Sequence, residues 1–264
     1  MPDLSIITIN YNNLEGLRST IDSVMNQHFR DVEYIMIDGG STDGSRELIE
    51  TNAQQFSYWI SEKDGGIYDA LNKGIEQAKG KYCMFLNSGD FLLRNDVLDN
   101  AFAIIRQQEL DVYYGDIELM FADGQKTIQH HAPVLDLHFL EKRTLNHQAS
   151  FIKRTLFEEL GQYNTGYSLA ADYAFYLEAF LKGKQFCYIN DVMVHYKRDG
   201  ISSTNMSAYL QQMNTIWNKL VPLPVQQLLE ENKKHRHNDK KVLVRFGKQL
   251  DRIYQSLKIK KKGN

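Results

Sequence analysis

Strand-like and helix-like stretches alternate through the first 110 residues, and this alternation restricts the fold more than any other feature of the chain. Each apolar run rich in β-branched and aromatic residues is followed by a stretch with apolar residues at helical spacing. Parallel strands need such helical crossovers, so the pattern predicts a mainly parallel sheet covered by helices on both faces. The predicted strands are LSIITINY (4–11), VEYIMID (32–38), SYWIS (57–61) and KYCMFLN (81–87). We therefore expect an α/β fold.

The regular alternation stops near residue 111. Residues 111–131 look like two strands joined at Asp123-Gly124, a dipeptide that favours a hairpin. A further strand, two helices and a last long strand are expected within residues 148–197, so the second half is α+β rather than regular βαβ. The predicted organisation is a main domain of residues 1–205, divided into halves 1–110 and 111–205, and a helical extension of residues 206–264.

The C-terminal segment differs from the rest of the chain in charge. Residues 233–264 carry 12 Lys and Arg against two acids, a local charge of +10 in a chain whose net charge is −2. Residues 242–257 predict a helix with one apolar stripe flanked by basic residues. Such a helix is either exposed to water or bound to an anionic membrane surface. A nucleic-acid partner is not favoured, because the preceding residues carry −12 and contain no recognition motif.

The N-terminus and the cysteines predict an intracellular protein. The segment MPDLSIITINYNN carries an acid where a signal peptide carries positive charge, and its apolar run is too short to cross a bilayer. Cys83 and Cys187 stand alone inside apolar runs, without metal or redox spacing, and are expected to be buried thiols in a reducing compartment. The expected location is the cytoplasm.

Polar residues gather at the carboxyl end of each predicted strand in the first half, which is the edge where open α/β sheets bind ligands. Glycines and acids also make turns and helix caps, so one such strand end would not indicate a site. Turns do not require an acid or an amide at every strand end, however, and together these ends favour a binding site. They are Thr8 with Asn10, Tyr11 and Asn12; Asp38 to Ser41; Glu62 with Asp64 to Gly66; and Asn87 to Asp90.

The chemistry of these strand ends excludes two common functions. Acids beside glycine loops suit the hydroxyl groups of ribose or of a sugar, and an acid that faces a diphosphate needs a divalent cation between them. The first strand is not followed by G-x-G-x-x-G, and no P-loop lysine motif is present. Hydride transfer with a dinucleotide and ATP hydrolysis are therefore not favoured.

Five segments together resemble the family 2 glycosyltransferases, which are inverting enzymes of the GT-A fold. They are SIITINYNN, IDGGSTDGS, EKDGGIYDALNKGIEQAKGKYCMFLNSGD, HQASFIK and AADYAFYLEAFLKG, and the resemblance spans roughly residues 4–205. It implies the GT-A (nucleotide-diphospho-sugar transferase) fold, an α/β fold with a mainly parallel central sheet followed by a C-terminal helical extension. Residues 1–110 would be the nucleotide-binding half and residues 111–205 the acceptor half.

The resemblance also implies which residues hold the nucleotide. Asp38 would hydrogen-bond the base or the ribose, and Lys73 or Asn72 would border the same site with Asp64. Lys197 and Arg198 would stabilise the leaving diphosphate. His147 and Gln148 would line the acceptor side. The complete set expected to contact the donor is Thr8, Asn10, Tyr11, Asp38, Asp64, Lys73, Ser88, Lys197 and Arg198.

The metal motif departs from the pattern of many family members. They carry D-x-D or D-D at the end of the fourth strand, whereas this chain has Asn87-Ser88-Gly89-Asp90 and so a single carboxylate. One carboxylate can still hold Mg²⁺ or Mn²⁺ when the diphosphate and water fill the other positions. Asp90 is the expected ligand. His195, at the end of the last strand, is a second ligand, a diphosphate contact or a structural histidine.

Inversion by direct displacement requires a base, because the attacking hydroxyl loses its proton as the new bond forms. In the family this base is an acid that precedes a helix in the second half, and Asp172 in LAADYAF matches that place. Asp172 could instead only cap its helix, and both roles could coexist.

The resulting hypothesis is an inverting glycosyltransferase (a hexosyltransferase) that moves one sugar from a UDP or GDP donor to a glycan acceptor in surface or capsular polysaccharide biosynthesis. The acceptor is expected to be lipid-linked, which favours the membrane-bound reading of the basic tail, on the inner face of the cell membrane. One alternative is a sugar-1-phosphate nucleotidyltransferase, but NYNNLEG is not the glycine-rich, arginine-containing loop that it needs. The other is a non-catalytic nucleotide-sugar binding module, against which the acids Asp90 and Asp172 argue.

Overall fold

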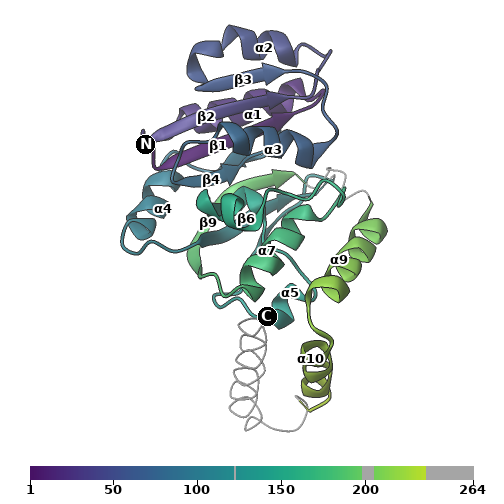
Figure 1. The fold of residues 1–264 in the computed structure, drawn as a ribbon. Helices are drawn as coiled ribbons and strands as arrows, with labels where there is room; N and C mark the ends of the chain where they lie inside the picture. The colour runs from purple at the N-terminus through teal and green to yellow at the C-terminus, as the bar shows by residue number, and fades with distance from the viewer. Residues whose placement is uncertain (122, 198–204, 236–264) are drawn as a thin grey trace. The chain divides into compact units, whose positions relative to one another are not determined.

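The computed structural model describes residues 1–121, 123–197 and 205–235. The chain divides into two compact units, Met1–Asn214 and Thr215–Asn264. The first unit is built on a nine-stranded sheet with the strand order β3-β2-β1-β4-β8-β6-β9-β5, and β7 pairs with β6 outside this path. Figure 1 shows this sheet with helices packed along it. The proposed division after residue 205 stays a prediction.

The first half of the sheet follows the predicted alternation. Its strands are β1 (Leu4–Asn10), β2 (Val32–Asp38), β3 (Tyr58–Ser61) and β4 (Tyr82–Phe85). All are joined in parallel, β1 lying between β2 and β4. The intervening helices are α1 (Leu14–Met25), α2 (Ser45–Thr51) and α3 (Ile67–Gln77), and α4 (Val97–Ile105) follows the short strand β5 (Phe91–Leu92).

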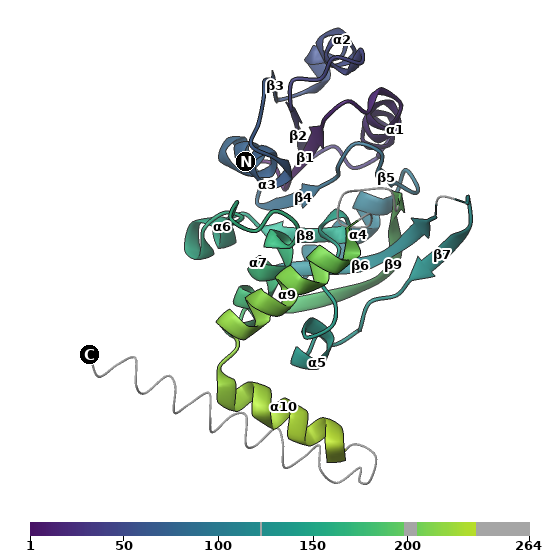
Figure 2. The same ribbon diagram turned by 90° about the vertical axis from the view of Figure 1, so that its right-hand side faces the viewer.

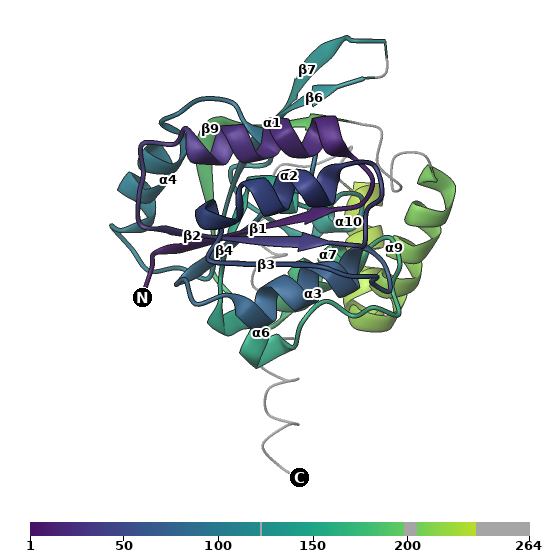
Figure 3. The same cartoon turned by 90° about the horizontal axis from the view of Figure 1, so that it is seen from above.

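Helices cover both faces of this half, as the uniformly apolar strands predict. Figure 3 shows α1 and α2 on one face and α3 on the other. Ile6 packs in one core cluster with Leu17 of α1, whereas the next residue of β1, Ile7, lies against α3. A Cβ at Gly74 of α3 would lie 2.4 Å from Cγ2 of Ile7, so the glycine permits this close packing.

The second half has a mixed sheet. It contains β6 (Val112–Met120), β7 (Lys126–Gln129), β8 (Ser150–Lys153) and the long β9 (Phe186–Lys197). Among the described strand pairs of the whole sheet, four are parallel and four antiparallel. Figures 2 and 3 show the predicted β6–β7 hairpin projecting from the sheet. The helical segments are α5 (Leu137–Leu140), η2 (His147–Ala149), α6 (Thr155–Leu160) and α7 (Ala171–Leu181).

Two pairings bring distant residues to one place. β9 runs parallel to β6, so that His195 lies beside Glu118, and antiparallel to β5, so that His195 also pairs with Phe91. Aromatic stacking of Phe157 on Phe175, at 4.7 Å between ring centroids, packs α6 against α7. The start of α7 is thereby fixed within the first unit.

The C-terminal part contains α9 (Met206–Leu220) and α10 (Leu223–His235). Within the described residues, no helix combines the length and the apolar character that crossing a membrane requires. The predicted basic helix at 242–257 lies outside the described residues. Cys83 and Cys187 are free thiols, the first buried and the second half-buried.

Candidate active site

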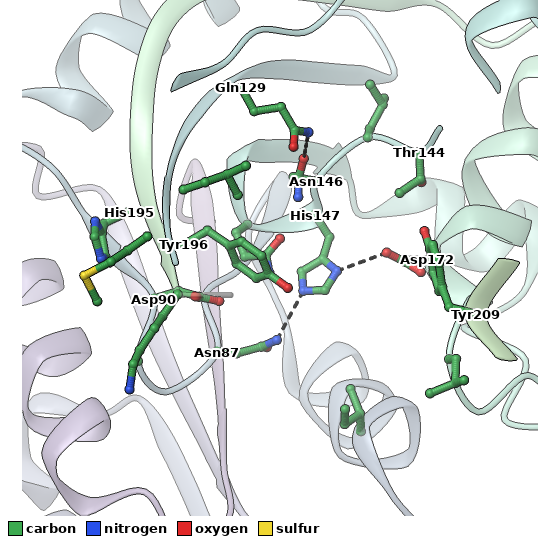
Figure 4. A pocket seen from close by; sticks show the side chains of 18 of the residues that line it. Asn87, Asp90, Gln129, Thr144, Asn146, His147, Asp172, His195, Tyr196 and Tyr209 are labelled. Atoms are coloured by element: carbon green, nitrogen blue, oxygen red, sulfur yellow. Dashed lines mark hydrogen bonds and ion pairs between the residues drawn. The ribbon is translucent and has the colours of Figure 1, made fainter. Parts of the chain in front are cut away.

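A cavity of about 900 Å³ lies in the first unit and is lined by residues from both halves of the sheet. The end of β4 contributes Asn87, Ser88 and Asp90, and the second half contributes Asp172 and His195. Figure 4 shows Asp90 and Asp172 at different sides of this cavity, with His147 between them. The fold therefore brings the predicted metal ligands and the predicted base to one cavity.

His195 is buried and held from two directions. Its Nδ1 lies 2.7 Å from Oε1 of Glu118, and its ring stacks on Phe91 with 4.4 Å between centroids. The hydrogen bond from His195 lowers the pKa of Glu118, which favours an ionised carboxylate and a proton on Nδ1. Nε2 of His195 then carries a lone pair, as a metal-binding imidazole needs.

The chemistry of this end of the cavity fits a divalent cation shared with a substrate diphosphate. Asp90 is 5% exposed and lines the cavity, so it offers a carboxylate, and His195 offers an imidazole whose other nitrogen is held by a carboxylate. A carboxylate behind a ligating histidine is a common arrangement at metal sites. The described residues contain no group of three or more acidic, histidine or cysteine side chains that could hold a metal, so substrate oxygens would have to complete the coordination.

Asp172 lies in the first turn of α7, and donors from two separate elements reach its carboxylate. The hydroxyl of Tyr68 on α3 donates to Oδ1 at 2.8 Å, and Nδ1 of His147 lies 3.4 Å from Oδ2. Burial, followed by the negative charge of Asp172, raises the pKa of Tyr68 well above its usual value, so the phenol stays a donor. Asp172 is not the side-chain cap of α7, because Ala170 stands at that position.

Asp38 closes the end of β2 and is fully buried. Its carboxylate accepts hydrogen bonds from Nδ2 of Asn10 at 2.8 Å and from the hydroxyls of Ser41 and Ser61, each at 2.6 Å. The backbone N–H groups of Gly40 and Ser41 add two more. Burial raises the pKa of Asp38, but these hydrogen bonds outweigh burial and lower it. Asp38 therefore organises the loop after β2 as an ionised acceptor.

Tyr11 and Asp64 meet beside this loop. A Cβ on Gly39 would lie 2.7 Å from Oδ2 of Asp64 and 3.2 Å from the ring of Tyr11, so Gly39 leaves room between them. Tyr11 is 67% exposed, and Asp64 accepts a hydrogen bond from the backbone N–H of Gly66. These side chains form an open edge near Asp38, outside the cavity lining.

Other residues that were expected to contact or border the nucleotide-sugar donor have interaction partners within the protein. The hydroxyl of Thr8 lies 3.1 Å from that of Tyr34 inside the sheet, and Lys73 forms an ion pair with Glu62 at 2.7 Å. Both side-chain hydrogen bonds of Asn72 go to the backbone of Tyr163.

Ser88 and Lys197 line the cavity, and Arg198 lies outside the described residues. The cavity is thus lined by the predicted metal ligands Asp90 and His195, the predicted base Asp172 and the predicted diphosphate contact Lys197. Apart from Ser88, the residues predicted to contact the nucleotide lie outside this lining. Their roles stay predictions.

Four residues in or directly behind the cavity wall have long-range contacts for which the sequence carries no recognisable signal. Tyr68 reads as a core residue of a helix, and Glu118 as part of an alternating strand. The sequence indicates Asn87 only as a strand-end amide, yet its Nδ2 lies 3.3 Å from Nε2 of His147. Tyr209 on α9 lines the cavity near Asp172, and burial, followed by the charge of Asp172, raises the pKa of the Tyr209 hydroxyl.

The mouth of the cavity carries apolar and basic side chains. Ile128 of the β6–β7 hairpin is 48% exposed, and Leu210 of α9 is 51% exposed. Met206 is exposed there as well, and Lys142 and Arg143 lie on the segment before η2.

The family model described as Glycosyl transferase family 2 matches residues 5–166. An uncharacterized glycosyltransferase of Mycobacterium tuberculosis is 37% identical over 183 residues, which cover 68% of this chain and 70% of the relative. The structure of S. aureus TarS 1-349 in complex with UDP has a TM-score of 0.65 at 16% identity, over 90% of this chain and 73% of that chain. Mannosyltransferase PcManGT from Pyrobaculum calidifontis, in complex with GDP-Man and Mn²⁺, has a TM-score of 0.59 at 16% identity, over 100% of this chain and 88% of that chain. These likenesses confirm the expected GT-A fold.

Proposed function

The chain belongs to glycosyl transferase family 2 and is a glycosyltransferase, and from this premise we propose that it inverts the anomeric centre of a nucleotide-diphosphate sugar. The observation that carries the proposal is the single cavity that holds Asp172 at one side and Asp90 with His195 at the other. Direct displacement requires the base and the leaving diphosphate to lie on different sides of the transferred sugar. The transferred sugar would lie between them.

The reaction follows from these roles. The acceptor hydroxyl attacks the anomeric carbon, and its proton passes to the carboxylate of Asp172 as the new C–O bond forms. The bond between the anomeric carbon and the diphosphate oxygen breaks, and its electron pair leaves with the nucleoside diphosphate. Attack from the face opposite the leaving group inverts the configuration. Asp172 suits this role because it lies in the first turn of α7 and lines the cavity, where its carboxylate can meet an acceptor hydroxyl.

We propose a UDP or GDP sugar as the donor, with Mg²⁺ or Mn²⁺. The solved neighbours in complex with UDP, and with GDP-Man and Mn²⁺, support these ligand classes. Asp90 and His195 would hold the cation, which when bound would neutralise charge on the leaving diphosphate. Lys197 lines the same cavity and would add positive charge. The nucleoside would lie toward Asp38, Asp64 and Tyr11.

The acceptor is proposed to be a glycan on a lipid carrier, in surface or capsular polysaccharide biosynthesis. Exposed Ile128 and Leu210 at the cavity mouth would contact an apolar carrier, and Lys142 and Arg143 would contact its phosphate groups. The site of action is proposed to be the inner face of the cell membrane, with the basic segment 233–264 as the electrostatic contact.

A donor screen followed by product analysis tests the proposal. Each nucleotide sugar is added with and without Mn²⁺, and stabilisation of the fold identifies the donor, because a ligand specific for the native state raises the apparent stability. The donor is then incubated with lipid-linked acceptors, and NMR gives the anomeric configuration of the product. A product with retained configuration contradicts inversion. Donor binding without hydrolysis or transfer favours the binding-module alternative.

A further inference from the structure

Asp172 belongs to a hydrogen-bonded chain that begins at the end of β4. Nδ2 of Asn87 lies 3.3 Å from Nε2 of His147, and Nδ1 of His147 lies 3.4 Å from Oδ2 of Asp172. Figure 4 shows the three side chains in this order along the cavity. His147 is 8% exposed, and its ring packs edge-on against Phe85 at 6.1 Å between centroids. The imidazole is therefore held in one orientation.

The donor pattern selects the tautomer of His147. An amide NH₂ group can only donate, so the contact with Nδ2 of Asn87 requires a lone pair on Nε2. A neutral imidazole with a lone pair on Nε2 carries its hydrogen on Nδ1, which is the nitrogen that faces Asp172. Each link in this chain then donates to the next, and the chain ends on the carboxylate.

The carboxylate of Asp172 is thereby fixed from both sides. His147 donates to Oδ2, and the hydroxyl of Tyr68 donates to Oδ1 at 2.8 Å. A carboxylate has about four lone-pair sites, so two donors leave others for the acceptor hydroxyl. The two donors come from η2 and α3, and Asp172 itself comes from α7. Rotation of the carboxylate would break one of these hydrogen bonds.

We propose that His147, held by Asn87 in the tautomer with the hydrogen on Nδ1, is a positioning residue that orients Asp172 for attack by the acceptor. This inference rests on the proposed role of Asp172 as the base. A base oriented by a third group is a general arrangement in enzymes that activate hydroxyl nucleophiles. Because His147 acts through Asp172, its loss should lower kcat and leave the KM for the donor nearly unchanged.

The carbonyl oxygen of Asn87 explains why this amide orientation matters. Oδ1 of Asn87 is buried and has no hydrogen-bond partner among the described residues. Turning the amide would place Oδ1 at Nε2 of His147 and would require a hydrogen there. The ring beside Asp172 would then be either an imidazolium or a neutral ring with a lone pair facing the carboxylate. The orientation of Asn87 is thus coupled to the protonation of His147.

Two substitutions of His147 separate the two ring nitrogens. In His147→Asn the side-chain amide lies near the position of Nδ1, so a donor to Asp172 remains and kcat should stay within about fivefold of wild type. In His147→Gln the amide lies near the position of Nε2, so that donor is lost. We expect kcat to fall by about 10- to 100-fold, as for loss of one hydrogen bond to a charged group. The donor KM should change by less than about twofold in both variants.

Comparison of the two variants decides the proposal. Equal kcat values for His147→Asn and His147→Gln, or a changed donor KM with a normal kcat, would overturn it. Asp172→Asn is measured in parallel. If Asp172→Asn keeps near-normal kcat, the proposed base is wrong and this inference falls with it. If Asp172→Asn is inactive and His147→Gln is as active as wild type, only the positioning role of His147 is wrong.

A spectroscopic measurement tests the tautomer of His147 directly. It requires neither an activity assay nor an active variant. The ¹⁵N chemical shifts of the histidine rings in the full chain distinguish a protonated from an unprotonated ring nitrogen, and loss of one signal in His147→Gln assigns His147. We expect a protonated Nδ1 and an unprotonated Nε2 at neutral pH. A neutral ring with its hydrogen on Nε2 would overturn the proposal. If His147→Gln does not fold, the signal of His147 is assigned by another route, and the same result remains decisive.

Discussion

Replacing Asp172 by asparagine should abolish most of the transfer while leaving the fold in place. Asparagine keeps the size of the side chain but cannot take a proton from the acceptor. Removal of a general base typically lowers the rate by about 10² to 10⁴, which corresponds to about 2.7 to 5.5 kcal/mol in the activation barrier. The KM for the donor should change little, because the proposed diphosphate site lies at the other side of the cavity.

The structure also gives the expected cost in stability. The carboxylate accepts from Tyr68 and from His147, whereas an asparagine has one carbonyl oxygen and places its NH₂ group against the other donor. Loss of one such hydrogen bond costs about 1 to 2 kcal/mol. For a chain of this size that lowers the melting temperature by about 2 to 8 °C. A domain stable by about 5 kcal/mol would remain more than about 99% folded, so unfolding cannot account for a rate loss of 10² or more.

The assay measures kcat beside the melting curve, with a matched control. Asp136 caps α5 by accepting a hydrogen bond from the backbone N–H of Phe139 at 2.8 Å, and it does not line the cavity. Asp136→Asn makes the same chemical change at a structural cap and should keep normal kcat. Near-normal kcat for Asp172→Asn, with a lowered melting temperature, would refute the assignment of the base. Asp116 and Glu118 are the next candidates for the base. Both would be poor replacements, since Asp116 accepts from Tyr188 and from the backbone of His131, and Glu118 is paired with His195 and Lys126.

Three further outcomes are expected. Asp90→Ala should remove the effect of Mn²⁺ on donor affinity in calorimetry, and an unchanged Mn²⁺ effect would contradict the metal assignment. Burial raises the pKa of Asp38, but hydrogen bonds from Ser41, Ser61 and Asn10 outweigh burial and lower it overall. The ionised form of Asp38 therefore stabilises the fold at pH values above the pKa of an unfolded Asp, which is about 3.9. This stabilisation is lost as the pH falls toward the lower pKa of the folded state. Asp38→Asn should therefore reduce the difference in urea-unfolding free energy between pH 6 and pH 3, and an unchanged difference would contradict this account. Deleting residues 233–264 should release the protein from anionic vesicles without loss of transfer to a water-soluble acceptor, and equal vesicle binding would favour an exposed charged tail.

The elements of the fold could be predicted because their signals are local. Apolar runs and helical spacing indicated β1 to β4 and their helices, and Asp123-Gly124 indicated the β6–β7 hairpin, which the structure confirms. Pairing between distant strands has no local signal. The parallel pairing of β6 with β9 and the antiparallel pairing of β5 with β9 bring Glu118, Phe91 and His195 together from three separate segments. The environment of His195 could therefore not be derived from the sequence.

The same limit explains which site residues were missed. Asp38 and Asp90 stand at strand ends, where sheet topology predicts ligands. Tyr68 and Asn87 gain their importance only from contacts with residues 104 and 60 positions away. A tyrosine in an apolar helix face normally reads as core packing, and only the approach of α7 to α3 makes its hydroxyl a donor to Asp172. Long-range packing, rather than residue type, decides its role.

Two histidine–carboxylate pairs flank the cavity in opposite arrangements, so that one presents its carboxylate to the cavity and the other its imidazole. In both pairs Nδ1 of the histidine faces a carboxylate, at 3.4 Å for His147 with Asp172 and 2.7 Å for His195 with Glu118. Asp172 lines the cavity and Asn87 covers Nε2 of His147, so that pair presents a carboxylate with lone pairs left for the acceptor hydroxyl, and its imidazole nitrogens are both engaged. Glu118 does not line the cavity, so the other pair offers the imidazole of His195 beside Asp90. A divalent cation that binds a carboxylate and an imidazole together would therefore be held on the Asp90 side, where His195 offers Nε2, and Asp172 would remain to accept the proton.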